Sequence, residues 1–545
     1  MRKAFRIIAF FLFIYLNNHA QTWTWAKSAG VYDWNIAYDI VTDKAGYSYV
    51  TGGFYDTAYF NTNMLTGTGW TIYLAKYSPN GKCVWAKSAG GTGEDYGTGV
   101  CFDNFGGLYL CGVFTDSVFF PTDTFATTSG IFDAFIARYD TAGNYIWSKQ
   151  CGEISNDEWA NGVGSDQWGN AYFTGSFSGS TTFGSPTSTL SAIGAADMFL
   201  AKFSLAGNTV WVKQAGGSFA SGASSYGDIA TDKNGNSFIT GGFGGTVAWG
   251  TNTLTSSVVD AYVTRYDSSG NCLWVRKGGG SAADGGNGIC MDKQKNCYIT
   301  GPFRTTAAFG TNLVASLGGA DIFIAKYDST GTNLWVIGGG DGGNDYGNGV
   351  SCDSLGNVYA TGQFNTAVKF GTVTVNGAGS NDVYVAKFFP NGTLDWLFAS
   401  GGINSDRGVK LSHDFYNNCY VTGDYWSVPA LFDTITLPGS SSGLPQIFVG
   451  KIVEGVSTGV KSFSNAISFD VFPNPSNGLL YISVPSTEIK SISIQNALGQ
   501  TVYSGNFSAG QKLITLDLSE YVPGMYFVEF QSPDTRMVKK IVLTR

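Results

Sequence analysis

The stretch that decides the fold is residues 338–364, GGGDGGNDYGNGVSCDSLGNVYATGQF, continued by FGTVTV at 370–375 and NDVYVAKFFPNGTLDW at 381–396. It is one copy of a repeat in which successive tryptophans are 60 to 64 residues apart. A tryptophan, a glycine after Thr or Cys, and an aspartate in a turn recur in every copy, at Trp25, Trp85, Trp147, Trp211, Trp274, Trp335 and Trp396, at Gly52, Gly112, Gly175, Gly241, Gly301, Gly362 and Gly423, and at Asp43, Asp103, Asp166, Asp232, Asp292, Asp353 and Asp414. Such regular self-similarity indicates a repeat architecture.

Each copy has the pattern of four short β-strands. In the copy quoted above, GVSCD and VYATGQF are separated by a Ser-Leu-Gly-Asn turn, which is typical of a hairpin. DVYVAKF alternates apolar and polar residues, and a Pro-Asn-Gly turn leads from it to LDWLFA. Four strands per repeat are typical of a β-propeller blade, and a stacked solenoid is the alternative.

The two ends of the repeat region favour the propeller. A tryptophan strand at 22–29 precedes any complete copy, whereas the last copy stops at 446–452 without one. A closed ring needs the N-terminal strand to complete the last blade. Ring closure therefore explains both the extra strand at the start of the repeat region and the missing strand at its end. The sequence therefore predicts an all-β fold in which residues 21–454 form one seven-bladed β-propeller closed by its N-terminal strand.

Composition excludes several classes of protein. The chain has 75 glycines, 43% hydrophobic and 15% aromatic residues, which argues against disorder and against a helical bundle. A net charge of −8 argues against a nucleic-acid partner, and two histidines, His19 and His413, are too few for a multi-histidine zinc site. After residue 20, the sequence has no run of about 20 apolar residues that could form a transmembrane helix.

Residues 1–20 have the pattern of a secretory signal peptide. Arg2, Lys3 and Arg6 precede an apolar run at 7–16, and Ala20 is the small residue before the expected cleavage site. The nine cysteines of the exported chain are interpreted mainly as small buried residues, and Cys290 with Cys297 is the one pair expected to be worth testing for a disulfide.

The repeat, with its GG…D…D..GN.Y.TG.F core and D.F.AKYD..GN..W tail, resembles the bacterial SBBP-type β-propeller repeats over about residues 22–454. Departures are few: Thr71 and Gln446 replace the aspartate of the third strand, and Lys295 and Asn417 replace the glycine of the turn. The resemblance implies a propeller architecture and little about chemistry.

The C-terminal part of the chain differs from the repeats. Residues 455–467 have the small and polar composition of a linker, and 468–545 contain short alternating strands with Pro, Asn and Gly turns, enough for a small Ig-like β-sandwich. PNP, NALGQ, PGMY and KK motifs follow in order and include Pro473, Asn474, Pro475, Gly499, Gly524, Tyr526, Lys539 and Lys540. This set resembles the type A sorting domain of type IX secretion in Bacteroidota. The resemblance implies the type IX machinery as partner and a secreted or outer-membrane surface-attached protein, and a mere adhesive sandwich is the alternative.

The sequence predicts no catalytic residue, no metal and no cofactor. The aspartate turns lack the spacing of a calcium loop, and the D..GN..W stretches are one residue longer on each side of the glycine than the Asp box of sialidases. His413 occupies a strand position and is interpreted as a structural residue. Paired carboxylates are the one catalytic option that the composition leaves open.

One set of acidic positions is a candidate site. Eight residues before each aspartate turn stand Asn35, Asp95, Glu158, Ser224, Asp284, Asp345 and Asp406. They precede the first strand of each blade, the strand that normally lines the axis of a propeller, so they are expected to circle one mouth of the central channel and attract a cation or a basic partner. The alternative is that each side chain caps backbone N–H groups in the glycine-rich turn between blades.

These observations predict a secreted or cell-surface module that binds a ligand or serves a structural role and is not an enzyme. A glycan or a protein is the expected ligand on the propeller. The alternative is a secreted carbohydrate-active propeller enzyme, a glycosidase or lyase, that uses paired carboxylates. Function tends to reside in non-repeating loops over a rigid scaffold, and the repeats contain no long insertion.

Overall fold

The computed structural model describes residues 21–30, 33–128, 130–152, 156–184, 186–217, 227–439, 443–454, 471–483, 491–496, 500–506, 513–531 and 536–544. The chain forms two compact units, one at residues 19–455 and one that contains residues 456–545. Within the described residues every element is a β-strand, so none is a helix able to cross a membrane. The expected signal peptide at 1–20 and linker at 455–467 lie outside the described residues.

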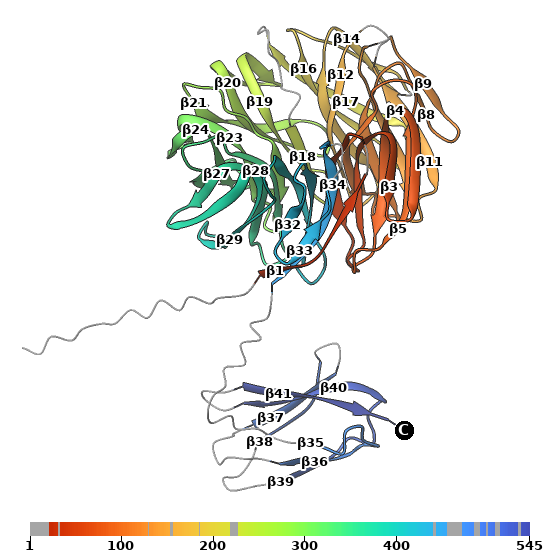
Figure 1. Cartoon of the computed structure of the whole chain (residues 1–545), viewed down its shortest axis with the longest axis vertical. Helices are drawn as coiled ribbons and strands as arrows, with labels where there is room; N and C mark the ends of the chain where they lie inside the picture. Colours follow the sequence, from red (N-terminus) through yellow and green to blue (C-terminus); the bar gives the residue numbers. More distant parts are fainter. Residues whose placement is uncertain are drawn as a thin grey trace, which may run out of the picture. The chain divides into compact units, whose positions relative to one another are not determined.

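The strands of the first unit form antiparallel arrays of four that have the form of propeller blades (Figure 1). Each strand pairs with its neighbour in a meander, because short turns join antiparallel strands. Within the described residues we number these arrays 1 to 7: β2 (Asn35–Thr42), β3 (Ser48–Phe60), β4 (Asn63–Tyr77) and β5 (Cys83–Gly90); β6 (Tyr96–Phe102), β7 (Gly107–Phe114), β10 (Asp133–Asp140) and β11 (Tyr145–Cys151); β12 (Glu158–Ser165), β13 (Ala171–Phe177), β16 (Asp197–Phe203) and β17 (Thr209–Gly217); β18 (Gly227–Thr231), β19 (Ser237–Trp249), β20 (Asn252–Tyr266) and β21 (Cys272–Gly280); β22 (Gly288–Met291), β23 (Cys297–Phe309), β24 (Asn312–Tyr327) and β25 (Asn333–Gly339); β26 (Tyr346–Cys352), β27 (Val358–Phe370), β28 (Val373–Phe388) and β29 (Leu394–Ser400); β30 (Asp406–His413), β31 (Cys419–Tyr425), β34 (Gln446–Glu454) and β1 (Gln21–Ala29).

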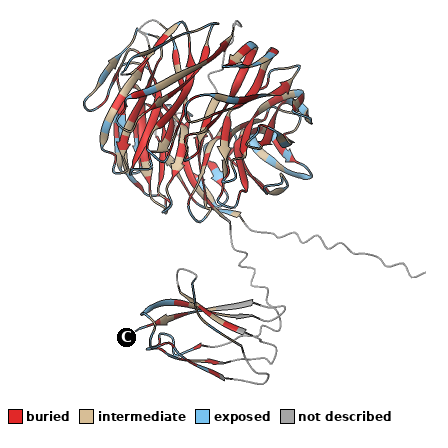
Figure 2. Ribbon diagram, turned by 180° about the vertical axis from the view of Figure 1, so that it is seen from behind, coloured by how far each residue is buried: buried red, intermediate tan, exposed pale blue. Residues whose placement is uncertain are grey.

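The hydrophobic core lies between neighbouring arrays. The second strand of array 2, β7, is buried along its whole length, and the buried residues of the first unit run along its strands (Figure 2). Leu74 of array 1 and Phe135 of array 2 belong to one cluster of buried side chains. A sheet that is covered on both faces needs apolar residues on both, which explains the nearly continuous apolar runs of the second and third strands.

A β-hairpin between the second and third strands of each array is a feature that the four-strand interpretation of the repeat missed. It extends the two strands themselves or forms separate short strands, β8 (Ser117–Phe119) with β9 (Thr124–Ala126), β14 (Ser180–Phe183) with β15 (Ser188–Ser191), and β32 (Ala430–Phe432) with β33 (Ile435–Leu437). The hairpin pairs with the fourth strand of the preceding array, as in Gly90 with Phe119 and Gly339 with Phe370. The FGTVTV stretch of the repeat forms this hairpin, which covers part of an outer strand edge.

The N-terminal strand β1 completes array 7. It pairs antiparallel with β34 from Gln21–Glu454 to Ala29–Ile447, and in Figure 1 it lies beside β34. Trp23 is 4% exposed, and its Nε1 donates to Ser400 Oγ of array 6 at 2.9 Å. The first and last strands of the first unit, far apart in the sequence, therefore share one array.

The recurring tryptophan of the fourth strand contacts the next array. Trp274 Nε1 of array 4 donates to the carbonyl oxygen of Ser329, in the turn before the fourth strand of array 5, at 3.1 Å. The same bond joins Trp25 to Pro79, Trp147 to Leu205, Trp211 to Ser268 and Trp335 to Pro390. Gly331 of the same turn has a φ of +85°, and a Cβ there would lie 2.8 Å from the Trp274 ring. The glycine and the tryptophan of the repeat tail are thus two halves of one contact between arrays.

Gly331→Ala is expected to lower the free energy of unfolding more than Gly106→Ala does. Gly106 has nearly the same φ, +86°, but a Cβ there would meet nothing within 4 Å, so both variants carry the same backbone strain. The clash with Trp274 should cost a further 1–3 kcal/mol or so, the usual scale of overpacking. Urea unfolding of both variants measures the difference, and equal midpoints would contradict the contact.

The second unit consists of two antiparallel sheets around one core. One sheet contains β35 (Val471–Phe472), β36 (Leu479–Ser483) and β39 (Leu513–Asp517), and the other contains β38 (Thr501–Asn506), β37 (Ser491–Asn496), β40 (Gly524–Gln531) and β41 (Arg536–Leu543). Leu480 and Ile482 of the first sheet share a buried cluster with Ile494, Val528 and Ile541 of the second. Alternation along each strand gives each sheet one apolar face, and the two faces pack together.

Candidate functional site

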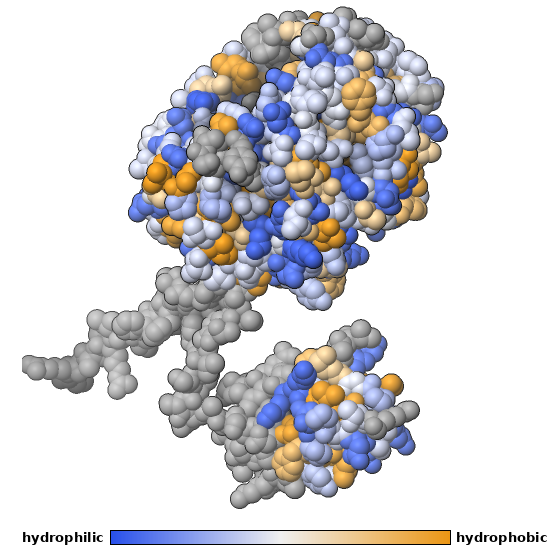
Figure 3. Space-filling view, turned by 45° about the vertical axis from the view of Figure 1, so that its right-hand side comes forward, coloured by the Kyte–Doolittle hydropathy of each residue, from blue (hydrophilic) through white to orange (hydrophobic). Residues whose placement is uncertain are grey.

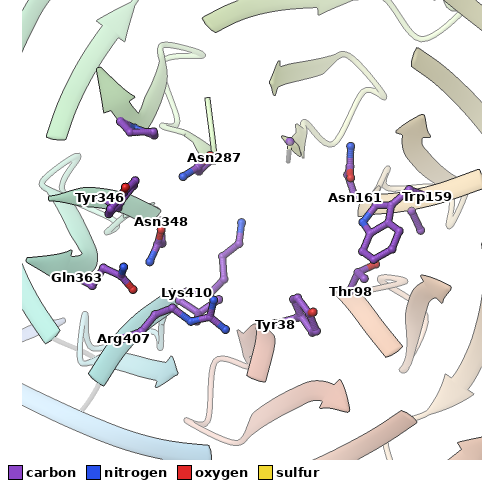
Figure 4. A pocket seen from close by; sticks show the side chains of 14 residues that line it. Tyr38, Thr98, Trp159, Asn161, Asn287, Tyr346, Asn348, Gln363, Arg407 and Lys410 are labelled. Carbon is purple, nitrogen blue, oxygen red and sulfur yellow. The ribbon is translucent and has the colours of Figure 1, made fainter. Parts of the chain in front are cut away.

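The first strands of the arrays surround an axial cavity. Each first strand contacts that of the next array, in the order β2, β6, β12, β18, β22, β26 and β30, and β30 contacts β2. The cavity between them has a volume of about 620 Å³ and is lined by Tyr38, Thr98, Trp159, Ala160, Asn161, Gly227, Asn287, Pro302, Tyr346, Asn348, Gln363, Arg407, Val409 and Lys410 (Figure 4). This volume lies within the range of small-molecule sites, about 300–1,000 Å³.

Two sequence positions supply most of the wall. The first, at the start of the strand, places Trp159, Tyr346 and Arg407 in arrays 3, 6 and 7. Two residues further on, a second position supplies Tyr38, Thr98, Asn161, Gly227, Asn287, Asn348 and Val409. We call Trp159, Tyr346 and Arg407 the rim, and the three asparagines of the second position, Asn161, Asn287 and Asn348, the amide layer.

The amides of this layer are held by the neighbouring array. Asn287 Nδ2 donates to Gly347 O and Asn348 Nδ2 donates to Gly408 O, both at 2.9 Å. Asn161 Oδ1 is buried and has no hydrogen-bond partner within the described residues. A buried acceptor that lacks a partner costs free energy, so a ligand donor at this point would stabilise the complex.

One residue after the second position the first strands converge. Glycine occupies this position in four arrays, at Gly99, Gly162, Gly288 and Gly349. A Cβ at Gly349 would lie 2.6 Å from Val409 O, and one at Gly99 would lie 3.1 Å from the Gly162 Cα. The close approach of adjacent strands is what requires glycine here.

In the other three arrays the same position is charged: Asp39, Asp228 and Lys410. Lys410 extends from array 7 across the axis, and its Nζ donates to Asp228 Oδ2 of array 4 (Figure 4). Asp228 Oδ2 also accepts the Ile289 N–H at 3.1 Å, and Asp39 Oδ2 accepts the Val100 N–H at 2.8 Å. Because Lys410 both lines the cavity and spans the axis, this charged cluster forms its floor.

The electrostatics keep Lys410 charged. Burial raises the pKa of Asp39 to about 7, against the opposing effect of Lys410. Burial alone would lower the pKa of Lys410, but the charges of Asp228 and Asp39 hold it above its ordinary value. An ammonium ion in contact with a carboxylate is stable in such a site because each charge compensates the other.

The acidic positions singled out in the sequence lie elsewhere. Asn35, Asp95, Glu158, Asp284, Asp345 and Asp406 are all buried and are not among the residues that line the cavity. Asp345 Oδ2 accepts the Asp341 N–H and its Oδ1 the Asn365 N–H, both at 2.9 Å. Asp406 accepts the Gly402 N–H at 2.7 Å in the same way. These contacts are those of the capping alternative; a ligand role for the six residues stays a prediction, and Ser224 lies outside the described residues.

Burial raises the pKa values of several of these capping carboxylates, to about 8 for Asp95, about 7 for Asp345 and about 6 for Asp284 and Asp406. Desolvation is the main cause in each case, and the backbone N–H groups oppose it.

The remaining residues of interest have structural contacts. Asp353 Oδ1 accepts the N–H groups of Leu355 and Asn357 in its turn, and within the described residues no three His, Cys, Asp or Glu side chains gather as a metal site. His413 lies in β30, and its Nδ1 is 3.0 Å from Ser351 Oγ.

The disulfide candidate needs a correction. Cys290 and Cys297 are both free thiols, because they are not partners in the β22–β23 ladder: Cys290 faces Tyr298, and Cys297 faces Met291.

The cavity residues were missed by sequence reasoning. A signal for the floor was present, since Asp39, Asp228 and Lys410 interrupt a column of glycines within the repeats. Tyr346 and Asn348 stand one and three residues after Asp345, so the wall lay beside the positions that were chosen.

In the second unit, the PNP motif is bound to the last strand. Asn474 Nδ2 donates to Lys540 O, and Asn474 Oδ1 accepts the Val542 N–H, both at 2.9 Å. Tyr526 Oη donates to Val522 O at 2.7 Å. Of the eight motif residues, Pro473, Asn474, Pro475, Gly524, Tyr526, Lys539 and Lys540 are described, and Gly499 lies outside the described residues.

Two family models match parts of the chain. Residues 470–544 match the secretion system C-terminal sorting domain, and residues 210–241 match the SBBP β-propeller repeat. Both resemblances noted in the sequence are thereby confirmed. The sorting domain indicates export by type IX secretion through interaction with that machinery, so the protein is secreted or attached to the cell surface.

Two individual proteins are similar to this chain. An uncharacterized WD repeat-containing protein of Acanthamoeba polyphaga mimivirus is 23% identical over 397 residues, which cover 58% of this chain and 28% of that protein. The chain thus spans less than a third of the length of this curated relative. A solved structure, a protein of unknown function from Bacteroides caccae, aligns over 62% of this chain and 92% of its own, with 9% identity and a TM-score of 0.32.

Proposed function

We propose that this chain is a secreted or surface-attached, non-enzymatic binding protein whose ligand occupies the axial cavity. In this proposal residues 21–454 form a closed seven-bladed β-propeller, and the C-terminal unit is an Ig-like sandwich that serves as the export signal. The observation that carries the proposal is the cavity itself, in which aromatic and amide side chains form the wall above a charged floor. Binding pockets combine apolar walls with a few placed polar groups in this way.

Within the described residues, the face of the first unit drawn in Figure 3 shows no comparable site. On the face drawn in Figure 3, hydrophobic side chains of the first unit lie in small groups among hydrophilic ones. Single exposed apolar residues are normal on a protein surface and mark no site.

A carbohydrate-active enzyme with paired carboxylates is the rival. Asp39 and Asp228 favour it, because both lie at the cavity floor and a carboxyl pKa of about 7, as at Asp39, suits a general acid. However, Asp39 accepts the Ile40 and Val100 N–H groups, and Asp228 accepts Ile229 and Ile289 N–H groups as well as Lys410. Such contacts suit a structural role for both carboxylates, which supports binding without catalysis.

The test is to incubate the purified full chain with an array of glycans and to analyse the glycans for cleavage. Binding with unchanged glycans is the expected result. Turnover that disappears in the Asp39→Asn or Asp228→Asn variant would establish the rival instead.

Removal of residues 460–545 should stop export. Because the sorting domain is a separate compact unit, the truncated chain should retain a folded first unit and accumulate inside the cell envelope. Immunoblots of culture medium, cell surface and envelope fractions measure this. As a control, Val522→Ala changes a 72%-exposed residue of the second unit and should leave export unchanged. Normal amounts of the truncated chain outside the cell would contradict the role of this unit.

A further inference from the structure

The cationic groups on the cavity wall are already neutralised. Arg407 Nη2 lies 2.9 Å from Asp424 Oδ1, and the Asp424 side chain is fully buried. Lys410 is paired with Asp228. An anionic ligand would have to compete with these buried carboxylates and leave one of them uncompensated, which is strongly unfavourable. The electrostatics therefore disfavour an anionic ligand.

The cavity wall presents rigid aromatic surfaces from both of its sequence positions. The Trp159 ring packs edge-on against Phe132 with 5.1 Å between centroids, and Tyr38 packs edge-on against Tyr96 at 6.1 Å. The face of an aromatic ring is apolar and electron-rich, and it accepts the C–H groups of a saturated ring. Trp159, Tyr346 and Tyr38 surround the cavity from three different arrays.

The amide layer below supplies hydrogen-bond acceptors. The amide nitrogens of Asn287 and Asn348 are bound to carbonyl groups of the next array, so the oxygen of each amide is the acceptor that these side chains can offer to a ligand. Asn161 Oδ1 is a buried acceptor without a partner within the described residues. A ligand that carries several hydroxyl groups on an apolar ring matches both layers.

The floor determines how such a ligand can enter. Lys410 crosses the axis to Asp228, and the adjacent glycine positions allow neighbouring strands to approach closely. A chain can therefore not pass through the cavity, and only its end can reach the amide layer.

We infer that the axial cavity binds the terminal units of an uncharged glycan, with the sugar rings against Trp159 and Tyr346 and their hydroxyl groups donating to Asn161 and its neighbours. This inference rests on the proposed binding function and specifies its ligand class.

The test measures the affinity of the purified full chain for defined probes by calorimetry. Neutral linear tetrasaccharides of glucose, mannose and N-acetylglucosamine are compared with a tetragalacturonate and a sialylated trisaccharide, and a cyclic glucan serves as a probe without a chain end. At least one neutral linear probe should bind, and the acidic and cyclic probes should bind at least tenfold more weakly.

Two variants locate the site. Trp159→Ala and Asn161→Ala should each weaken binding at least tenfold, because they remove a ring surface and a buried acceptor. Thermal unfolding of both variants beside the parent chain separates a lost ligand contact from misfolding, since Asn161→Ala removes the amide nitrogen as well as the Oδ1 atom that has no partner within the described residues. Trp168→Ala is the matched control, because this tryptophan of the same array lies in a turn and is 56% exposed.

The possible failures separate the two proposals. Binding of acidic probes alone would overturn the ligand class and leave the binding function standing. Neutral binding unchanged in both cavity variants would overturn the site, and equal binding of the cyclic glucan would overturn the end-on mode. Absence of binding to every probe at about millimolar concentration would overturn the inference, whereas cleavage of a probe would overturn the non-enzymatic function itself.

Discussion

A chain that lacks residues 21–29 is expected to lose cooperative folding of the first unit. The deletion removes the whole of β1 and exposes the edge of β34, with which β1 pairs along its length. It also removes two tryptophans that are 4% and 8% exposed, Trp23 and Trp25. Truncation of one such buried aromatic costs about 3–5 kcal/mol, and the loss of two approaches the total stability of a typical domain, about 5–15 kcal/mol.

Thermal unfolding followed by near-ultraviolet circular dichroism measures this effect. Thr22→Ala with Thr24→Ala is the matched control, because both threonines are exposed on the same strand. A synthetic peptide of residues 21–29, added to the deleted chain, should restore the transition by pairing with the vacant edge. An unchanged melting temperature in the deleted chain would contradict closure by β1.

Lys410→Ala is expected to lower the free energy of unfolding by about 2–4 kcal/mol. Leaving a buried charge without its partner usually costs about 3–5 kcal/mol, and the 16% exposure of the Asp228 side chain reduces this cost. The variant removes the cation that contacts Asp228 and that opposes the rise of the Asp39 pKa. Lys410→Met combined with Asp228→Asn removes both charges and should recover most of the loss, since an apolar replacement of a whole buried pair is often nearly neutral.

The cost of Lys410→Ala should depend on pH. The pKa of Asp39 in the folded chain, about 7, lies above the ordinary value of about 3.9, so the folded state holds this proton more tightly than the unfolded state. The stability that Asp39 contributes is therefore present at low pH and is lost as the pH rises toward 7. Without Lys410 an ionised Asp39 is less well compensated, so the loss should be larger at pH 8 than at pH 5. Urea unfolding at the two values measures this, and an equal cost at both would contradict the proposed floor.

For the capping carboxylates, the sequence predicts where the residues lie along the chain but not which way their side chains point. Position eight before each aspartate turn was recognised as unusual and was expected to precede the first strand. It does so directly before β6 and β26, whereas β12 and β30 already begin at this position, with Glu158 and Asp406. Whether these side chains face the axis or the turn depends on the backbone N–H groups that are nearby, such as those of Gly402 and Trp426. Those groups come from separate turns, and a pattern in one strand does not contain them.

The hairpins between second and third strands were missed for a different reason. FGTVTV and its counterparts are short, and their pairing partner is the fourth strand of another array, as with Gly339 and Phe370. The prediction from sequence considered hydrogen bonding between strands within each repeat and not between repeats. The glycine of the hairpin turn, Gly371, can be recognised in the sequence, and the structure gives it a φ of +61°. Which strand the hairpin pairs with is decided by the tertiary structure, because that strand belongs to another repeat.

By itself the sequence determined the repeat, its four main strands and the sorting domain, because these depend on periodicity and on local turn residues that act within a few positions. The tertiary structure alone decided the functional geometry. It brought Lys410 and Asp228, 182 residues apart, into contact across an axis that exists only when the arrays surround it. It likewise brought together four residues that are far apart in the sequence, and these form part of the wall of one cavity: Trp159, Asn161, Tyr346 and Asn348. Spacing along a chain specifies which residues share a strand, whereas the meeting of strands from different arrays depends on packing between their faces, and that packing made the site.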